Sequence, residues 1–228
     1  MDPRKELILN TIIKEHIKTG APVGSGILVE KYKLDISPAT ARNEMADLEA
    51  EGYIVQPHTS AGRIPTEIAY NYYLQKMQMK KISKSDKDSL EEILKENTEE
   101  SFKNVAKHLS QLSGVAVFWA FHRHNLYYTG ISNLFQQPEF SRLNIIFDIS
   151  AIIDRIDEII NEVFSDIPNG LDTKIGTKSP FGDFSGSIMA KYKFGEHEGL
   201  FGLLGPMRMD YERNLALIDF VYNKINNA

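Results

Sequence analysis

The chain has 228 residues, of which 42% are hydrophobic and 25% are charged, and its formal net charge is −5 at pH 7. These values are ordinary for a globular protein of one or two domains, and no run of about eighteen apolar residues indicates a membrane span. The sequence contains no cysteine, which excludes disulfides, thiolate metal sites and a cysteine nucleophile. Without cysteines or a secretory signal pattern at the N-terminus, we expect a cytoplasmic protein.

Three helices are predicted in the N-terminal part of the chain. The first covers about residues 3–18 and ends at Gly20, and the second covers about residues 26–33, with Ser25 as its N-cap. The third helix, about residues 38–51, has the clearest boundaries. Ser37 is a good N-cap, Pro38 suits the first helical position, and Gly52 can end the helix in a left-handed conformation.

The third helix is predicted to have one buried face and one polar face. Its apolar residues recur at helical spacing and are expected to face inward: Ala41, Met45 and Leu48. The same geometry turns a second group outward, with Arg42 on the flank: Ala39, Thr40, Asn43 and Asp47.

A β-prone stretch, residues 53–56, follows this helix, and a polar loop, residues 57–63, follows the stretch. A fourth helix is predicted from Thr66 to about Met79. Helix, strand, polar hairpin and helix in this order predict a winged helix-turn-helix, whose usual partner is duplex DNA. The alternatives are a winged helix that contacts protein or serves as a structural cap.

The residue types on the third helix suit base recognition. Asn43 can make two hydrogen bonds to adenine, and Arg42 can bind guanine or a phosphate in the same bidentate manner. The net charge gives only weak support for DNA binding. Residues 1–82 hold eleven lysines and arginines and ten acidic residues, a net charge of +1, and the remainder of the chain carries −6. Phosphate contacts would therefore depend on clustered cations, for which the candidates are Lys14, Lys18, Arg42 and Arg63.

We expect three segments: a winged-helix DNA-binding domain at 1–80, a polar linker at 81–89 and a second domain at 90–228. A long amphipathic helix with a polar break near 97–100 is predicted to start within the linker, at residue 85 or 86, and to continue into the second domain. Strands are predicted at 114–121, 125–131, 173–175, 186–194 and 199–204. Residues 138–164 are predicted to be mostly helical, with 143–149 as an alternative strand, and 211–226 form a last helix. The fold class is therefore α+β, with helices packed on an antiparallel sheet.

No pattern of catalytic, metal-binding or cofactor-binding residues stands out. The six histidines are scattered, and Gly199, Gly202 and Gly205 lack the order of a nucleotide-binding loop. Small residues at these positions suit a strand where backbones approach closely. We expect neither an enzyme nor a cofactor or metal site.

Three blocks of sequence resemble one family. PVGSGILVEKYKLDISPATARNEMADLEAEGYIVQPHTSAGRIPT, at 22–66, closely resembles the N-terminal domain of HrcA, the bacterial heat-inducible transcription repressor family, and QPHTSAGRIPT is highly specific to it. A second block that resembles the same family is LYYTGISNLFQQPEF, at 126–140. GLFGLLGPMRMDY, at 199–211, is similar to the family's C-terminal GxxGPTRMxY signature, with Met207 in place of Thr.

The resemblance implies a winged helix followed by a GAF-like domain, and a homodimer that binds an inverted-repeat operator called CIRCE upstream of chaperone operons. It also implies that the chaperonin GroEL keeps the repressor competent to repress. When heat occupies GroEL with unfolded client proteins, repression would lapse. The positions that this resemblance and the helical pattern assign to DNA contact are Ser25, Ser37, Ala39, Thr40, Arg42, Asn43, His58, Thr59, Ser60, Gly62 and Arg63.

The chain departs from the family in length, because members commonly exceed 300 residues, and the family's dimerisation insert is expected to be missing. Dimerisation would then use the long helix, the sheet edge or the fourth helix. Two rival functions are a regulator whose GAF-like domain binds a small molecule, which needs a deep pocket, and a winged-helix adaptor that binds protein.

Overall fold

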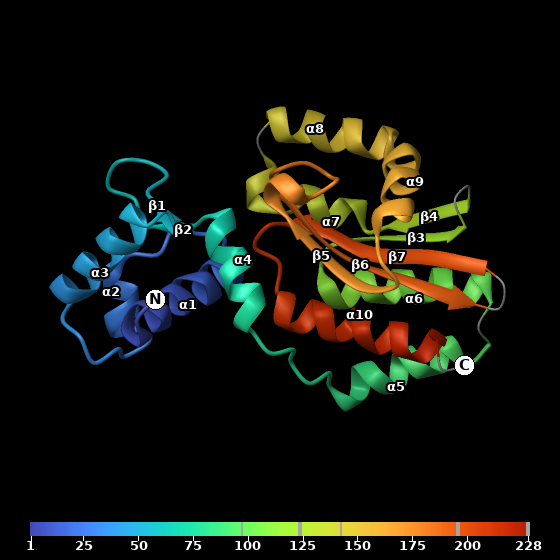
Figure 1. The fold of residues 1–228 in the computed structure, drawn as a ribbon, viewed down its shortest axis with the longest axis horizontal. Helices are drawn as coiled ribbons and strands as arrows, with labels where there is room; N and C mark the ends of the chain where they lie inside the picture. Colours follow the sequence, from blue (N-terminus) through green and yellow to red (C-terminus); the bar gives the residue numbers. More distant parts are fainter. Residues whose placement is uncertain (97, 123–124, 142, 195–196, 227–228) are drawn as a thin grey trace. The chain divides into compact units, whose positions relative to one another are not determined.

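A computed structural model describes residues 1–228 except 97, 123–124, 142, 195–196 and 227–228. The chain divides into two compact units, residues 1–77 and 78–228 (Figure 1). The first unit contains α1 Pro3–Thr19, α2 Ser25–Glu30, α3 Pro38–Ala50, β1 Ile54–Val55, β2 Ile64–Pro65 and α4 Glu67–Lys76.

The helices of the first unit begin and end at the residues that their caps favour. Asp2 accepts hydrogen bonds from the N–H groups of Arg4 and Lys5 at the start of α1, and Gly20 ends that helix with φ of +67°. Such side-chain acceptors satisfy N–H groups that have no partner within a helix. The core between the helices is made of aliphatic and aromatic side chains: Ile8, Leu9, Ile12, Ile13, Leu28, Ala41, Met45, Leu48, Tyr70 and Tyr73.

The second unit is built on a five-stranded antiparallel sheet with the order β4-β3-β7-β6-β5. The strands are β3 Ala116–His122, β4 Asn125–Thr129, β5 Gly170–Ile175, β6 Ser185–Phe194 and β7 His197–Pro206. The helices are α5 Lys84–Ile93, α6 Glu99–Ser113, α7 Ile131–Phe135, α8 Leu143–Asp154, α9 Ile156–Asp166 and α10 Tyr211–Asn226, with short 3-10 turns at 94–96, 138–141 and 176–178. The predicted α+β class, an antiparallel sheet with flanking helices, is confirmed.

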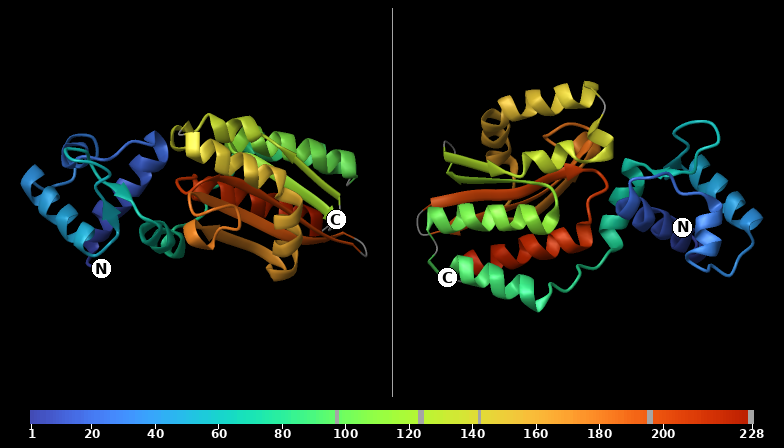
Figure 2. Two further views of the ribbon diagram at one scale, coloured as in Figure 1. Left: turned by 90° about the horizontal axis from the view of Figure 1, so that it is seen from above. Right: turned by 180° about the vertical axis from the view of Figure 1, so that it is seen from behind.

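Helices cover both faces of this sheet (Figures 1 and 2). On the α6 and α10 face, the Trp119 ring stacks on Phe201 at 4.4 Å and on Phe102 of α6 at 5.1 Å, and its indole N–H donates to Tyr192 at 2.8 Å. On the opposite face, α7, α8 and α9 enclose a second core with side chains that include Phe118, Met189, Leu134, Ile149, Ile160 and Phe164. Alternating side chains along each strand supply both cores.

The structure differs from the predicted elements at several boundaries. Ser25 is the first residue of α2, and Gly24 occupies the N-cap position without a side-chain bond. The helix predicted from residue 85 or 86 begins at Lys84, because Ser83 caps α5 by accepting from the N–H of Asp86 at 3.0 Å, and it therefore takes up most of the predicted linker, 81–89. Residues 143–149 belong to α8, so the alternative strand is wrong. None of the described helices is long and apolar enough to cross a membrane.

A buried carboxylate connects α1 to the end of α2. Glu15 is 4% exposed and accepts hydrogen bonds from Lys31 Nζ at 2.7 Å and from the Tyr32 hydroxyl at 2.6 Å. The Lys31 hydrogen bond, followed by that of Tyr32, lowers the pKa of Glu15 below its ordinary value of 4.5. The same contact raises the pKa of Tyr32 to about 12. Ionised Glu15 therefore stabilises the packing of these two helices.

We expect Glu15→Gln to lower the free energy of unfolding at neutral pH by about 1 to 3 kcal/mol, because the charge-assisted hydrogen bonds are lost in a buried site. A depressed pKa in the folded state stabilises the protein above the unfolded pKa, and this contribution disappears as pH falls through the folded value. The difference between variant and wild type, measured by chemical denaturation, should therefore shrink below the ordinary pKa of 4.5. Glu30→Gln, at an exposed position, is the control, and a loss equal to that of Glu15→Gln would contradict the assignment.

Candidate nucleic-acid interface

The first turns of α3 present short polar groups to solvent. Ser37 Oγ accepts from the N–H of Thr40 at 3.0 Å, and the two hydroxyls are 2.9 Å apart. Ser37, Ala39, Arg42 and Asn43 are exposed, and Thr40 is half-buried. The inward residues Ala41, Met45 and Leu48 are buried, as their spacing predicted.

The loop between β1 and β2 forms a tight turn at its tip. The N–H of Ala61 donates to the carbonyl of His58 at 3.0 Å, and Ser60 has φ of +67°. His58, Thr59 and Ser60 are all exposed. A left-handed conformation is unusual for serine, so the closed turn holds this hydroxyl-bearing residue in a conformation that glycine adopts more easily.

Gly62 lies against the backbone that precedes α2. A Cβ atom at this position would be 2.5 Å from the carbonyl carbon of Val23 and 2.6 Å from its oxygen, which no side chain tolerates. The close approach permits a β-bridge in which Val23 and Arg63 exchange two backbone hydrogen bonds of 2.8 and 2.9 Å. The loop is thereby attached to the segment that leads into α2.

Glu49 attaches the same loop to α3. Its carboxylate accepts from Arg63 Nε at 2.8 Å and from the N–H of Gln56 at 3.1 Å. The Gln56 side chain in turn donates to the carbonyl of Ala61 at 3.1 Å, so both ends of the loop are held. Glu49 and Gln56 were not predicted as site residues. The available signal was the position of Glu49 four residues after the buried Met45, which places a charge beside the packed face of the helix.

The carboxylates of α3 are paired with cations. Glu44 lies 3.7 Å from Arg4, and Asp47 lies 3.2 Å from Lys5, which also binds Glu51 at 2.8 Å. The hydrogen bond to Glu51, then that to Asp47, raises the pKa of Lys5. By contrast, the described residues provide no hydrogen bond or ion pair for the exposed Arg42 guanidinium. Although the net charge is close to zero, the acids of α3 are therefore largely paired with cations, whereas the exposed Arg42 guanidinium is not paired with any described acid.

An open hollow of about 450 Å³ lies between α2, α3 and the loop. It brings together five of the predicted site residues with neighbouring backbone, and the five are Ser25, Arg42, Ser60, Gly62 and Arg63. Arg63 is half-buried and bound to Glu49, so its side chain positions the loop, whereas Arg42 is available to a ligand. Among the described residues, no cluster of histidines and acids forms a metal site.

The first unit thus combines an exposed helix start, a polar hairpin loop and an unpaired arginine around one hollow, and the second unit is an α+β domain. Residues 55–215 match the family model described as HrcA protein C terminal domain. The chain belongs to the HrcA family of heat-inducible transcription repressors.

Curated relatives match nearly the whole chain. The heat-inducible transcription repressor HrcA of Carboxydothermus hydrogenoformans is 26% identical, covering 97% of this chain and 96% of the relative, and that of Natranaerobius thermophilus is 28% identical, covering 99% and 96%. The first alignment runs over 328 positions, about 100 more than this chain has residues. A crystal structure of a hypothetical protein at 2.2 Å resolution has the same fold, with a TM-score of 0.78, 18% identity and coverage of 100% of this chain and 98% of that chain.

We expect Gly62→Ala to displace the loop and to destabilise the first unit by about 1 to 3 kcal/mol, because the new methyl group overlaps immovable backbone. Thermal unfolding followed by circular dichroism measures the change. Gly26→Ala is the matched control, since a Cβ atom there meets nothing within 4 Å. Equal stability of the two variants would contradict the close approach at Val23.

Proposed function

We propose that the protein is a transcriptional repressor in which residues 1–80 form a winged helix-turn-helix that binds duplex DNA. The surface formed by the first turns of α3 and the loop would be its reading surface, and residues 90–228 would be a GAF-like regulatory domain. The observation that carries the proposal is the free, exposed Arg42 on a helix whose own carboxylates are paired with cations. A guanidinium in this setting suits a guanine edge or a phosphate.

We assign separate roles to the predicted site residues. Asn43, one position after Arg42, would read a base edge, and Ser37 with Thr40 would donate to the phosphate backbone at the helix start. The loop residues His58, Thr59 and Ser60 would contact the backbone or the minor groove as a wing. Ser25, Ala39 and Gly62 would permit close approach of the DNA, and Arg63 would hold the wing in place.

The operator would be an inverted repeat of CIRCE type, bound by a homodimer, because two related half-sites call for two related reading surfaces. The alignment of this chain with longer relatives supports the view that the dimerisation insert is missing. The rival function of small-molecule sensing needs a deep pocket, whereas the hollow of about 300 Å³ that residues 80–86 and 213–217 line in the second unit is open to solvent. The hollow in the core beneath α8, lined by residues such as Phe140 and Phe181, holds about 10 Å³, which is the room for one water molecule.

We expect Arg42→Ala to weaken binding to a CIRCE-type duplex by 1 to 3 kcal/mol, about five- to 150-fold, because a bidentate contact is lost. Fluorescence anisotropy at fixed salt measures the affinity. Lys95→Ala makes the same change in net charge at an exposed residue of the second unit and should bind as the wild type does. An equal loss in both variants would contradict a specific contact and indicate a general effect of charge.

Asn43→Ala should reduce the preference for the operator over a scrambled duplex by about 1 to 3 kcal/mol per half-site, because a base contact is lost. The salt dependence of binding should stay unchanged, since asparagine displaces no counterion. Titrations of both duplexes at several salt concentrations measure the two quantities. If the variant weakened binding to both duplexes equally, base reading by Asn43 would be refuted.

We also propose that a GroEL-type chaperonin keeps this repressor competent, which accounts for relief of repression by heat. At constant repressor concentration, added chaperonin should raise operator occupancy in a gel shift. An unfolded client protein that fills the chaperonin should abolish the increase by mass action. Occupancy that ignores both additions would favour direct sensing of temperature by the repressor.

A further inference from the structure

Two of the three surfaces that the sequence offers for dimerisation are used within their own units. On α4, Tyr70 and Tyr73 are 1% and 4% exposed and pack in the core of the first unit. On α5 and α6, the apolar stripe is buried in the second unit, with Leu90, Val105 and Leu109 fully inaccessible. Both stripes are therefore buried in their own units, although Ile68 of α4 is 56% exposed. The sheet edge is the candidate that offers the backbone of a whole strand to a second copy.

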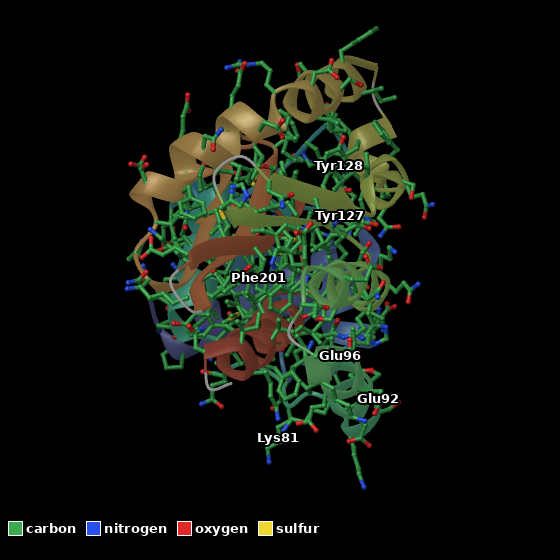
Figure 3. The ribbon with its side chains drawn as sticks, turned by 90° about the vertical axis from the view of Figure 1, so that its right-hand side faces the viewer. Lys81, Glu92, Glu96, Tyr127, Tyr128 and Phe201 are labelled. Atoms are coloured by element: carbon green, nitrogen blue, oxygen red, sulfur yellow. The ribbon has the colours of Figure 1, made fainter. Side chains whose placement is uncertain are left out.

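β4 is a free edge of the five-stranded sheet. It pairs with β3 on one side, and within the described part of the chain its other side bonds to no strand. Figure 3 shows Tyr127 and Tyr128 on this strand, and Tyr128 is 42% exposed. An edge strand has unpaired N–H and C=O groups on its outer side that can bind another strand.

The composition of β4 is unusual for an edge that faces only water. Asn125–Thr129 contains no charged residue and no proline, and its centre is Leu-Tyr-Tyr. The opposite edge strand, β5, carries Asp172 and Lys174, whose charged groups lie 3.9 Å apart. Charges and prolines normally protect an edge from pairing, so β5 has such protection and β4 does not.

We propose that β4 pairs antiparallel with β4 of a second copy of this chain, about a two-fold axis at Tyr127, an inference that rests on the proposed function. In this register Tyr127 lies opposite its own counterpart, Leu126 lies opposite Tyr128, and Asn125 lies opposite Thr129. Every pair is uncharged, so the strand pairing itself places no like charges opposite each other, and the nearby Glu99 and Lys103 of α6 are paired with each other at 2.8 Å. The result is one continuous sheet across a closed, isologous dimer, which supplies the two-fold symmetry that an inverted repeat needs.

The test uses opposite charges on the axis. The wild type should sediment as a dimer of its 25.9 kDa chain at micromolar concentration. Tyr127→Glu and Tyr127→Lys should each sediment as a monomer, because like charges then lie directly opposite each other. An equimolar mixture of the two variants should restore the dimer, since unlike charges then face each other across the axis.

Phe147→Glu is the matched control, because Phe147 is the most exposed large hydrophobic residue described, at 72%, and lies on α8. It should dimerise as the wild type does. A monomeric wild type, dimeric single variants, a mixture that stays monomeric or a monomeric Phe147→Glu would each overturn the proposal. Circular dichroism checks that the Tyr127 variants fold. Tyr128→Lys, at a more exposed position of the same strand, is the second variant and should weaken the dimer by at least about tenfold.

DNA binding separates this inference from the proposed function. Tyr127→Glu should bind a duplex with one half-site as the wild type does and should lose only the added affinity for the inverted repeat. A wild type that dimerises through Tyr127 but binds neither duplex would refute the proposed function and leave the pairing of β4 intact. A variant that loses binding to the single half-site as well would show that the substitution disturbs more than the interface and would overturn the assignment.

Discussion

The candidate surface depends on the contact between Gly62 and the backbone of Val23. Only a residue without a Cβ atom permits this approach, and the approach in turn permits the bridge between Val23 and Arg63. The bridge fixes the loop beside α2, and the Arg63 side chain then reaches Glu49 of α3. One backbone contact thus determines where the hydroxyls and imidazole of the loop lie relative to the exposed start of α3.

In the first unit, many charged side chains form ion pairs, and positive charge is not in large excess over negative charge. Arg4 and Lys5, at the start of α1, form ion pairs with acids on one side of α3. Arg63 forms an ion pair with Glu49 of the same helix. Such exposed pairs add little stability individually. Their larger effect is on the electrostatic potential, because the unpaired Arg42 then acts on a surface without competing carboxylates. A net charge near zero is therefore compatible with anion binding.

The second unit uses its two sheet faces for packing and has two edge strands, of which β4 carries no charged residue. Stacked aromatic rings around Trp119 fill the face under α6 and α10, and a mixture of aliphatic side chains and phenylalanines fills the face under α7 to α9. With both faces covered, the open backbone of β4 is the part of this sheet suited to another chain. The two cores hold the sheet from both sides, and the edge at β4 is where we propose that a second copy pairs.

The sequence by itself determined the α+β class, most helices and strands, and the inward residues of α3, because helical and strand periodicity, caps and turn glycines are local signals. It placed a linker at 81–89 across the start of the helix that it also predicted from residue 85 or 86, since a polar serine-rich and lysine-rich stretch resembles a linker until its amphipathic face is packed. Only the tertiary structure decided that Arg63 binds Glu49 while Arg42 stays free. Both are arginines near the same loop, and their difference arises from contacts between segments distant in sequence, which no local pattern records.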